Sequence, residues 1–168
     1  MKNIKIIGCG EGVSAVSYIK NRCIPDAVCI AAAPTAGELA GIDADIKLEY
    51  GEIIGAADFS RAAGLAENDI IFVVGDCRPL PIIAPGHMYN IACCYCFIPF
   101  LFEGRQKYKT AALQYDLLKS SGFNVVKIDS DEVMRKVSKA MGAHTTFAQM
   151  NEAVYDYICR DILKRTAE

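Results

Sequence analysis

Short apolar runs alternate with helical patterns along almost the whole chain, and this alternation constrains its fold more than any other feature. The runs predicted to be strands are residues 3–8, 27–32, 45–50, 69–75, 91–98 and 123–128. Helices are predicted at 13–22, 36–41, 59–67, 104–120 and 145–165, with a further short helix after the capping residue Asp129. Strands joined by helices become parallel neighbours, because such connections cross over one face of a sheet. We therefore predict an α/β fold, a Rossmann-like three-layer sandwich with a mostly parallel six-stranded sheet.

The amount of apolar sequence is sufficient for a single core. Of the 168 residues, 52% are apolar, a composition that excludes a disordered chain. A chain of this length buries roughly 68–70% of its unfolded surface. Residues 1–168 are therefore expected to form one domain. The 18 basic and 20 acidic residues leave a net charge of −2 without a basic run, which argues against a nucleic-acid partner.

The sequence predicts no membrane span. The longest apolar stretch, Ile91–Phe102, has about half of the roughly 20 residues that a spanning helix needs. The first residues predict a strand and a turn, without the charged and apolar regions of a signal peptide. We therefore expect a cytoplasmic protein in which the eight cysteines are free thiols.

Three neighbouring cysteines, Cys93, Cys94 and Cys96, invite a metal or redox interpretation. In a strand, however, alternation sends Cys94 and Cys96 to one face and Cys93 to the other, so the three thiolates would not converge on one ion. No CxxC pair or HxxxH motif occurs elsewhere in the sequence. Small, buried and inert thiols are the favoured interpretation, with metal or redox chemistry as the alternative, and no metal site is predicted.

The turn after the first predicted strand is rich in glycine, with Gly8, Gly10 and Gly12 preceding Ser14 at the start of a helix. Glycines let backbone amides approach an anion, and the N-terminus of a helix adds partial positive charge. Ligands of such sheets bind beyond the carboxyl ends of the strands, where this turn lies. The dinucleotide fingerprint is incomplete, because Val13 stands where its third glycine would be. A phosphate-binding turn and a tight turn without a ligand therefore both remain open.

Several segments of the chain form a recognisable series. They are GCGEGVSAV (8–16), DADIKLEYG (43–51), the Gly-Ala step at 55–56, NDIIFVVG (68–75), IPFLFEGR (98–105), IDSDEV (128–133) and NEAVYDYICR (151–160). In this order they resemble the nucleotide-binding domain of the FtsZ/tubulin superfamily. Together they span nearly the whole chain. The resemblance implies the fold of that domain and a guanine nucleotide, GTP or GDP, as its ligand.

In that superfamily the nucleoside is held by positions that correspond here to Pro99, Glu103, Lys107, Phe147 and Asn151. The chemistry of these residue types agrees with this role. A carboxylate accepts ribose hydroxyl hydrogens, an aromatic ring stacks on a base, and an amide both donates and accepts toward a base edge. Phe147 and Asn151 are four residues apart, so they lie on one helical face. The alternative is that Phe147 is a core residue and Asn151 is solvated.

The phosphate end departs from the superfamily. The resemblance places there Gly8, Gly10, Glu11, Gly12, Ser14, Gly55, Ala56 and Gly75. The glycine-rich signature of the superfamily is replaced by the segment GDCRPLP (75–81), in which the prolines have no N–H to donate. Asp76 would repel a phosphate, Arg78 would partly compensate, and Glu11 adds another negative charge to the first turn.

Hydrolysis in the superfamily needs acidic residues from a loop that follows the long helix. This sequence ends at Glu168, directly after that helix. We therefore expect a nucleotide-binding pseudo-GTPase that does not hydrolyse GTP alone. Association with itself or with another FtsZ-like protein is the expected mode of action.

Two other functions follow from different residues. A structural or interaction module without a nucleotide would use the apolar segment Leu80–Tyr89 as its partner-binding surface, and substitutions at Ile82 or Ile83 would disrupt the resulting oligomer. An enzyme would use Cys77 or one of the two histidines, His87 and His144. Neither histidine has a triad partner that the sequence makes evident.

Overall fold

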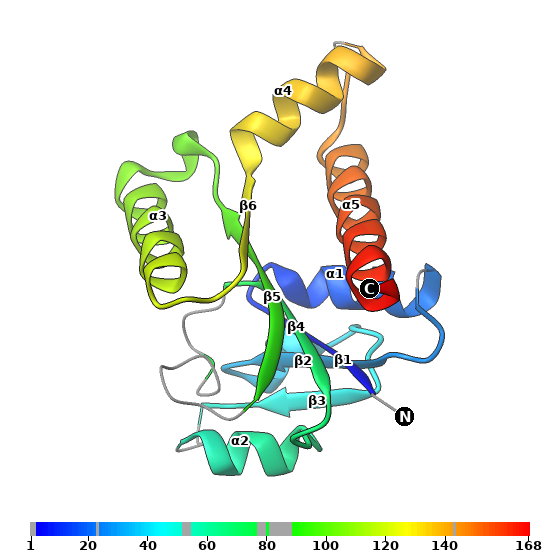
Figure 1. Ribbon diagram of the computed structural model, residues 1–168. Helices are drawn as coiled ribbons and strands as arrows, with labels where there is room; N and C mark the ends of the chain where they lie inside the picture. The colour runs from blue at the N-terminus through cyan, green and yellow to red at the C-terminus, as the bar shows by residue number, and fades with distance from the viewer. Residues whose placement is uncertain (1–2, 23, 52–54, 77–79, 81–88, 143) are drawn as a thin grey trace.

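Six parallel strands form one sheet at the centre of the molecule (Figure 1). The computed structural model describes residues 3–22, 24–51, 55–76, 80, 89–142 and 144–168. The strands are β1 (Ile4–Cys9), β2 (Val28–Ala33), β3 (Ile46–Glu49), β4 (Ile70–Gly75), β5 (Asn90–Ile98) and β6 (Val125–Asp129). Their order is β3-β2-β1-β4-β5-β6, so the winding direction reverses between β1 and β4. The predicted Rossmann-like α/β fold with a six-stranded parallel sheet is confirmed.

Helices cover both faces of this sheet. They are α1 (Gly12–Arg22), α2 (Ala56–Ala62), α3 (Arg105–Ser120), α4 (Ser130–Met141) and α5 (Phe147–Ala167), with the 3-10 helices η1 (Ala36–Leu39) and η2 (Leu101–Glu103). α1 and α5 share one apolar core with the sheet, in which Val16, Phe72 and Ile158 are completely buried. On the opposite face, Phe59 of α2 belongs to a second core, against which α3 packs Leu118. The two cores give the predicted three layers.

A polar contact attaches α5 to the sheet. Tyr95 of β5 is completely buried, and its hydroxyl donates a hydrogen bond of 2.7 Å to Asp161 Oδ2. Arg165, one turn further along α5, donates to the same oxygen at 2.7 Å. Partial burial opposes ionisation of Asp161, but the hydrogen bonds from Arg165 and Tyr95 outweigh it and lower the pKa of this carboxyl. The buried hydroxyl of Tyr95 therefore has a charged hydrogen-bond acceptor, the carboxylate of Asp161.

The cysteines of β5 alternate between the two faces of the sheet, as predicted. Cys93 lies in the core under α1 and α5, whereas Cys94 and Cys96 lie in the opposite core. Burial raises the pKa of Cys93 to about 11, so this thiol stays protonated near neutral pH. The expectation that every cysteine is a free thiol is wrong for Cys159, which is disulfide-bonded.

Two helices differ in extent from the prediction. α2 covers Ala56–Ala62 rather than 59–67, because Gly55 precedes it with a φ of 92° and Gly64 follows it with a φ of 60°. These left-handed conformations bound the helix at positions that apolar periodicity does not reveal. α4 has 12 residues and is longer than predicted, although Asp129 caps it as expected by accepting two backbone N–H groups of its first turn.

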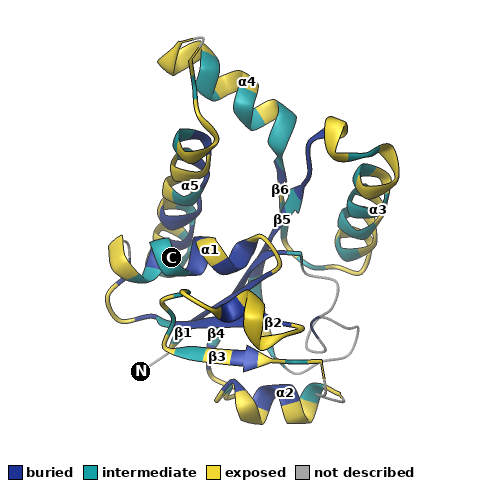
Figure 2. Ribbon diagram, turned by 180° about the vertical axis from the view of Figure 1, so that it is seen from behind, coloured by how far each residue is buried: buried dark blue, intermediate teal, exposed yellow. Residues whose placement is uncertain are grey.

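α3 and α4 lie at the periphery of the molecule. Neither helix contains a completely buried residue, and Figure 2 shows half-buried and exposed residues along both. Among the described residues, no helix has the length and apolar character needed to cross a membrane. α3 contacts β5 and β6, and α4 contacts β6, so the two helices flank this edge of the sheet.

Candidate functional site

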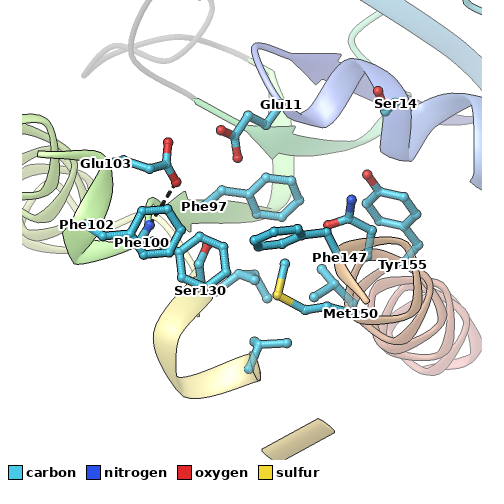
Figure 3. Close-up of a pocket in the computed structure, with 14 residues that line it drawn as sticks. Glu11, Ser14, Phe97, Phe100, Phe102, Glu103, Ser130, Phe147, Met150 and Tyr155 are labelled. Atoms are coloured by element: carbon cyan, nitrogen blue, oxygen red, sulfur yellow. Dashed lines mark hydrogen bonds between the residues drawn. The ribbon is translucent and has the colours of Figure 1, made fainter. Parts of the chain in front are cut away.

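A cavity of about 440 Å³ opens at the carboxyl ends of β5 and β6, between the N-terminal parts of α1 and α5 (Figure 3). We call it the first cavity. Its walls come from the turn before α1, from β5 and η2, from the start of α4 and from α5. This is the end of a parallel sheet at which ligands bind, because loops and helix N-termini converge there.

Aromatic rings form much of the wall of the first cavity. They are Phe97 of β5, Phe100 and Phe102 from the segment that follows, and Phe147 and Tyr155 of α5. The rings of Phe100 and Phe102 stack with centroids 4.9 Å apart, and Phe147 meets Phe100 edge-on at 5.6 Å. Phe147 is 57% exposed, so it is a wall of the cavity and not a core residue. Such rings present apolar faces to a flat aromatic ligand.

Asn151 lies one turn after Phe147 on α5, and both residues line the first cavity together with Glu103. The side-chain amide of Asn151 makes no hydrogen bond to another residue in the part of the chain that the structure describes. Its oxygen and its amino group are therefore available to a ligand, one as an acceptor and the other as a donor. The structure thus brings Glu103, Phe147 and Asn151 to one space, and what they bind there stays a prediction.

Glu103 is oriented by two hydrogen bonds. Its Oε1 accepts the backbone N–H of Phe100 at 3.0 Å, and its Oε2 accepts Lys107 Nζ at 2.7 Å. The bond from Lys107 lowers the pKa of Glu103, and the N–H of Phe100 adds to this effect. Glu103 is therefore ionised near neutral pH, and the positive charge of Lys107 is paired with it.

Glu11 lies immediately before α1 and lines the first cavity together with Ser14. Figure 3 shows its carboxylate pointing toward that of Glu103, on the same side of Phe97. Partial desolvation raises the pKa of Glu11, the charge of Glu103 raises it further, and Lys107 opposes this. Two carboxylates therefore face each other where α1 begins.

A second cavity of about 430 Å³ lies on the other side of Phe97, toward α3. Five of the predicted site residues line it: Gly10, Glu11, Gly75, Pro99 and Lys107. Glu11 and Phe97 border both cavities, so the two spaces are neighbours. The predicted site residues are thus divided between two adjoining cavities at the same end of the sheet.

Three of the predicted glycines, Gly8, Gly12 and Gly75, allow close packing of the backbone. A Cβ on Gly12 would lie 1.9 Å from Val74 O, and one on Gly75 would lie 2.1 Å from Cys9 O. A Cβ on Gly8 would lie 2.3 Å from Gly12 O. α1 therefore approaches β1 and β4 this closely because these positions carry no side chain. Packing accounts for these three glycines whether or not a ligand binds.

Other predicted residues do not contribute to either cavity. Gly55 and Ala56 lie at the start of α2 and line neither space. Outside the described residues lie Cys77, Arg78, Ile82, Ile83 and His87. Within the described ranges, no group of three or more His, Cys, Asp or Glu side chains is arranged to hold a metal ion.

Comparison with solved structures identifies the fold, although no family model and no curated protein sequence matches the chain. The empty FtsZ dimer of M. jannaschii matches with a TM-score of 0.70 at 15% identity, over 96% of this chain and 53% of that chain. A point mutant of M. jannaschii FtsZ matches with a TM-score of 0.63 at 16% identity, over 96% and 55% of the two chains. The chain has an FtsZ-like fold. It spans about half the length of the FtsZ chains that it matches.

The FtsZ-like segments also contain lining residues that the sequence prediction missed. Phe100 and Phe102 belong to the segment IPFLFEGR, and Tyr155 belongs to the segment NEAVYDYICR. Tyr155 lies one turn beyond Asn151, so helical spacing alone was enough to find it. Phe97 follows from strand alternation, since it faces away from the core that holds Cys96.

Proposed function

We propose that this FtsZ-like chain binds a guanine nucleotide of the GTP or GDP type through its nucleoside end, and that it does not hydrolyse GTP on its own. The observation that carries this proposal is the first cavity, in which Glu103, Phe147 and Asn151 line one space. An aromatic face suits a purine, an amide suits the base edge, and a carboxylate suits the ribose hydroxyls. The FtsZ-like fold supports the same class of ligand.

The proposed lack of hydrolysis rests on the charges near the start of α1. Phosphoryl transfer needs positive charge or metal ions that stabilise the phosphate oxygens. Here Glu11 and Glu103 point toward one another, and Lys107 is paired with Glu103 at 2.7 Å. We expect phosphate release from GTP to equal that in buffer without protein, which a phosphate-release assay with the purified chain measures.

Binding is tested by calorimetry with guanosine, GDP and GTP. Phe147→Ala should weaken binding about 5- to 150-fold, because base–aromatic stacking contributes roughly 1–3 kcal/mol per base. Tyr157→Ala is the matched control, since Tyr157 is another exposed aromatic residue of α5 that does not line the cavity. Absence of heat with every guanine ligand, on a folded sample, would contradict the proposal.

The proposal includes action in the cytoplasm by association with itself or with another FtsZ-like protein. Sedimentation velocity over a range of concentrations, with and without GDP, tests self-association. A sedimentation coefficient that is independent of concentration in both cases would leave only a different FtsZ-like partner, which co-sedimentation with an FtsZ then tests.

A second candidate function is an interaction module without a nucleotide. It is favoured by Leu113 and Leu117 of α3, which are 63% and 64% exposed and lie one turn apart. The segment predicted for this role, Leu80–Tyr89, lies mostly outside the described residues, and Leu80 itself is buried. This function predicts a concentration-dependent oligomer that Leu113→Glu with Leu117→Glu disrupts, and a thermal stability that no nucleotide changes.

A further inference from the structure

The first cavity combines an apolar, aromatic end with an anionic end. Resting on the proposed function, we infer that the site selects against phosphate, so that guanosine binds more tightly than GMP, GDP or GTP. This order is the reverse of that of a site built to hold phosphates.

The charges that line the first cavity support this order. Glu11 and Glu103 both contribute carboxylates, and no Lys or Arg is among the described residues that line it. The neighbouring cation, Lys107 of the second cavity, already donates to Glu103 at 2.7 Å. A phosphate that entered from the first cavity would therefore meet negative charge that is not fully compensated.

Glu11 lies at the N-terminus of α1, where a phosphate would otherwise be attracted most strongly. The N-terminus of a helix attracts anions through its free N–H groups and its dipole. Glu11 directly precedes Gly12, the first residue of α1, and lines both cavities. The raised pKa of Glu11 has the same origin, since partial desolvation and the charge of Glu103 both disfavour its ionised form. A phosphate bound beside Glu11 would therefore add to the repulsion that Glu11 and Glu103 already exert on each other.

The backbone around this turn is also engaged within the protein. The N–H of Val13 donates to Gly10 O at 3.3 Å, and the N–H of Asp76 donates to Cys9 O at 3.3 Å. The ideal Cβ position of Gly75 lies 2.6 Å from the nitrogen of Gly12. The glycines thus bring α1 against β4. The N–H groups of Val13 and Asp76 already donate within the protein, so neither is free to bind an oxyanion.

The nucleoside end shows none of these obstacles. Phe147 is 57% exposed at the wall of the first cavity, and the Asn151 amide has no hydrogen-bond partner among the residues that the structure describes. A neutral nucleoside therefore gains stacking and base-edge hydrogen bonds without bringing charge to the carboxylates. Each phosphate added to it brings repulsion, and the described residues that line the first cavity include no cation to offset it.

The test is calorimetry with guanosine, GMP, GDP and GTP in the absence of divalent cations, on the wild-type chain, Glu11→Gln and Glu152→Gln. The wild type should bind guanosine about tenfold more tightly than GTP, the size of a close repulsion between partly solvated charges. Glu11→Gln should reduce this ratio several-fold. Glu152→Gln, which removes an exposed carboxylate of α5 that does not line either cavity, should leave the ratio unchanged.

The outcomes separate this inference from the proposed function. Affinity that is equal for all four ligands, or that rises with each phosphate, overturns the preference and leaves guanine binding intact. No binding of any ligand to the folded wild type overturns both. A ratio that Glu11→Gln does not change shows that the preference does not come from Glu11 and overturns the charge argument.

Discussion

Replacing Gly12 by alanine is the sharpest test of why the first turn is rich in glycine. The added Cβ would lie 1.9 Å from Val74 O and 2.9 Å from the nitrogen of Gly75. Helix propensity alone predicts the opposite sign, because alanine inside a helix is roughly 1 kcal/mol more favourable than glycine. The two effects therefore compete at one position, and the structure decides which is larger.

The obstacle to the new Cβ is backbone, which cannot rotate away as a side chain does. The start of α1 would have to move away from β4 by about 1.5 Å to restore an ordinary contact, and overpacking of this kind costs typically about 1–3 kcal/mol or more. We expect Gly12→Ala to lower the free energy of unfolding by about 2 kcal/mol net of the propensity gain. At about 2–4 °C per kcal/mol for a chain of this size, Tm should fall by about 4–8 °C.

Urea unfolding followed by far-ultraviolet circular dichroism measures the difference. Gly37→Ala in η1 is the control, because the nearest atom to its new Cβ, Thr35 Oγ1, lies 4.0 Å away. It should change the free energy of unfolding by less than about 0.5 kcal/mol. If Gly12→Ala were as stable as the wild type, close packing would not require this glycine, and its role would return to ligand binding.

Three further outcomes are expected. Tyr95→Phe should destabilise the protein by about 1.5–3 kcal/mol at pH 7, because it removes a hydrogen bond to a charged group. Since the pKa of Asp161 is lowered in the folded state, its contribution should be lost as the pH falls through that folded pKa, so the difference between wild type and variant narrows in acid denaturation. Glu11→Gln should stabilise the free protein at pH 7 by about 0.5 kcal/mol, since this exposed carboxyl has a raised pKa and its ionisation opposes folding. The gain should disappear below the unfolded value of 4.5, where Glu11 is protonated in both states. Ile158→Ala should cost about 2–5 kcal/mol in urea unfolding, because Ile158 is completely buried between α5 and the sheet.

The sheet was predictable from the sequence because strand formation here follows a local pattern. The predicted strand 27–32 and the observed β2 (Val28–Ala33) differ by one residue at each end. The opposite faces of Cys93 and Cys94 followed from alternation alone. The bounds of α2 were not predictable in the same way, because they depend on left-handed glycines whose conformation no apolar period encodes.

The candidate site was only partly predictable. The resemblance indicated Glu103, Phe147 and Asn151, and helical spacing placed Phe147 and Asn151 on one face. The structure places all three at one cavity, and what they bind there stays a prediction. Tyr155 was missed although it continues the same spacing. The glycines were the harder case, since a glycine that admits an anion and one that admits a neighbouring strand look the same in sequence. The atom that distinguishes them, Val74 O beside Gly12, lies far away along the chain.

Because glycines can serve packing or ligand binding, the fold of this chain and its ligand have to be inferred from different residues. The close approach of α1 to β4 requires Gly8, Gly12 and Gly75 for packing, so a chain that had lost phosphate binding would still need them. An FtsZ-like turn is therefore evidence for the sheet and not for a phosphate. Information about the ligand comes instead from residues that packing does not require. In this chain they are Phe147, which is exposed at the cavity wall, and Glu11, whose ionised form is disfavoured by partial burial and by the charge of Glu103. One favours a base and the other disfavours a phosphate, so nucleoside binding and phosphate binding must be measured separately.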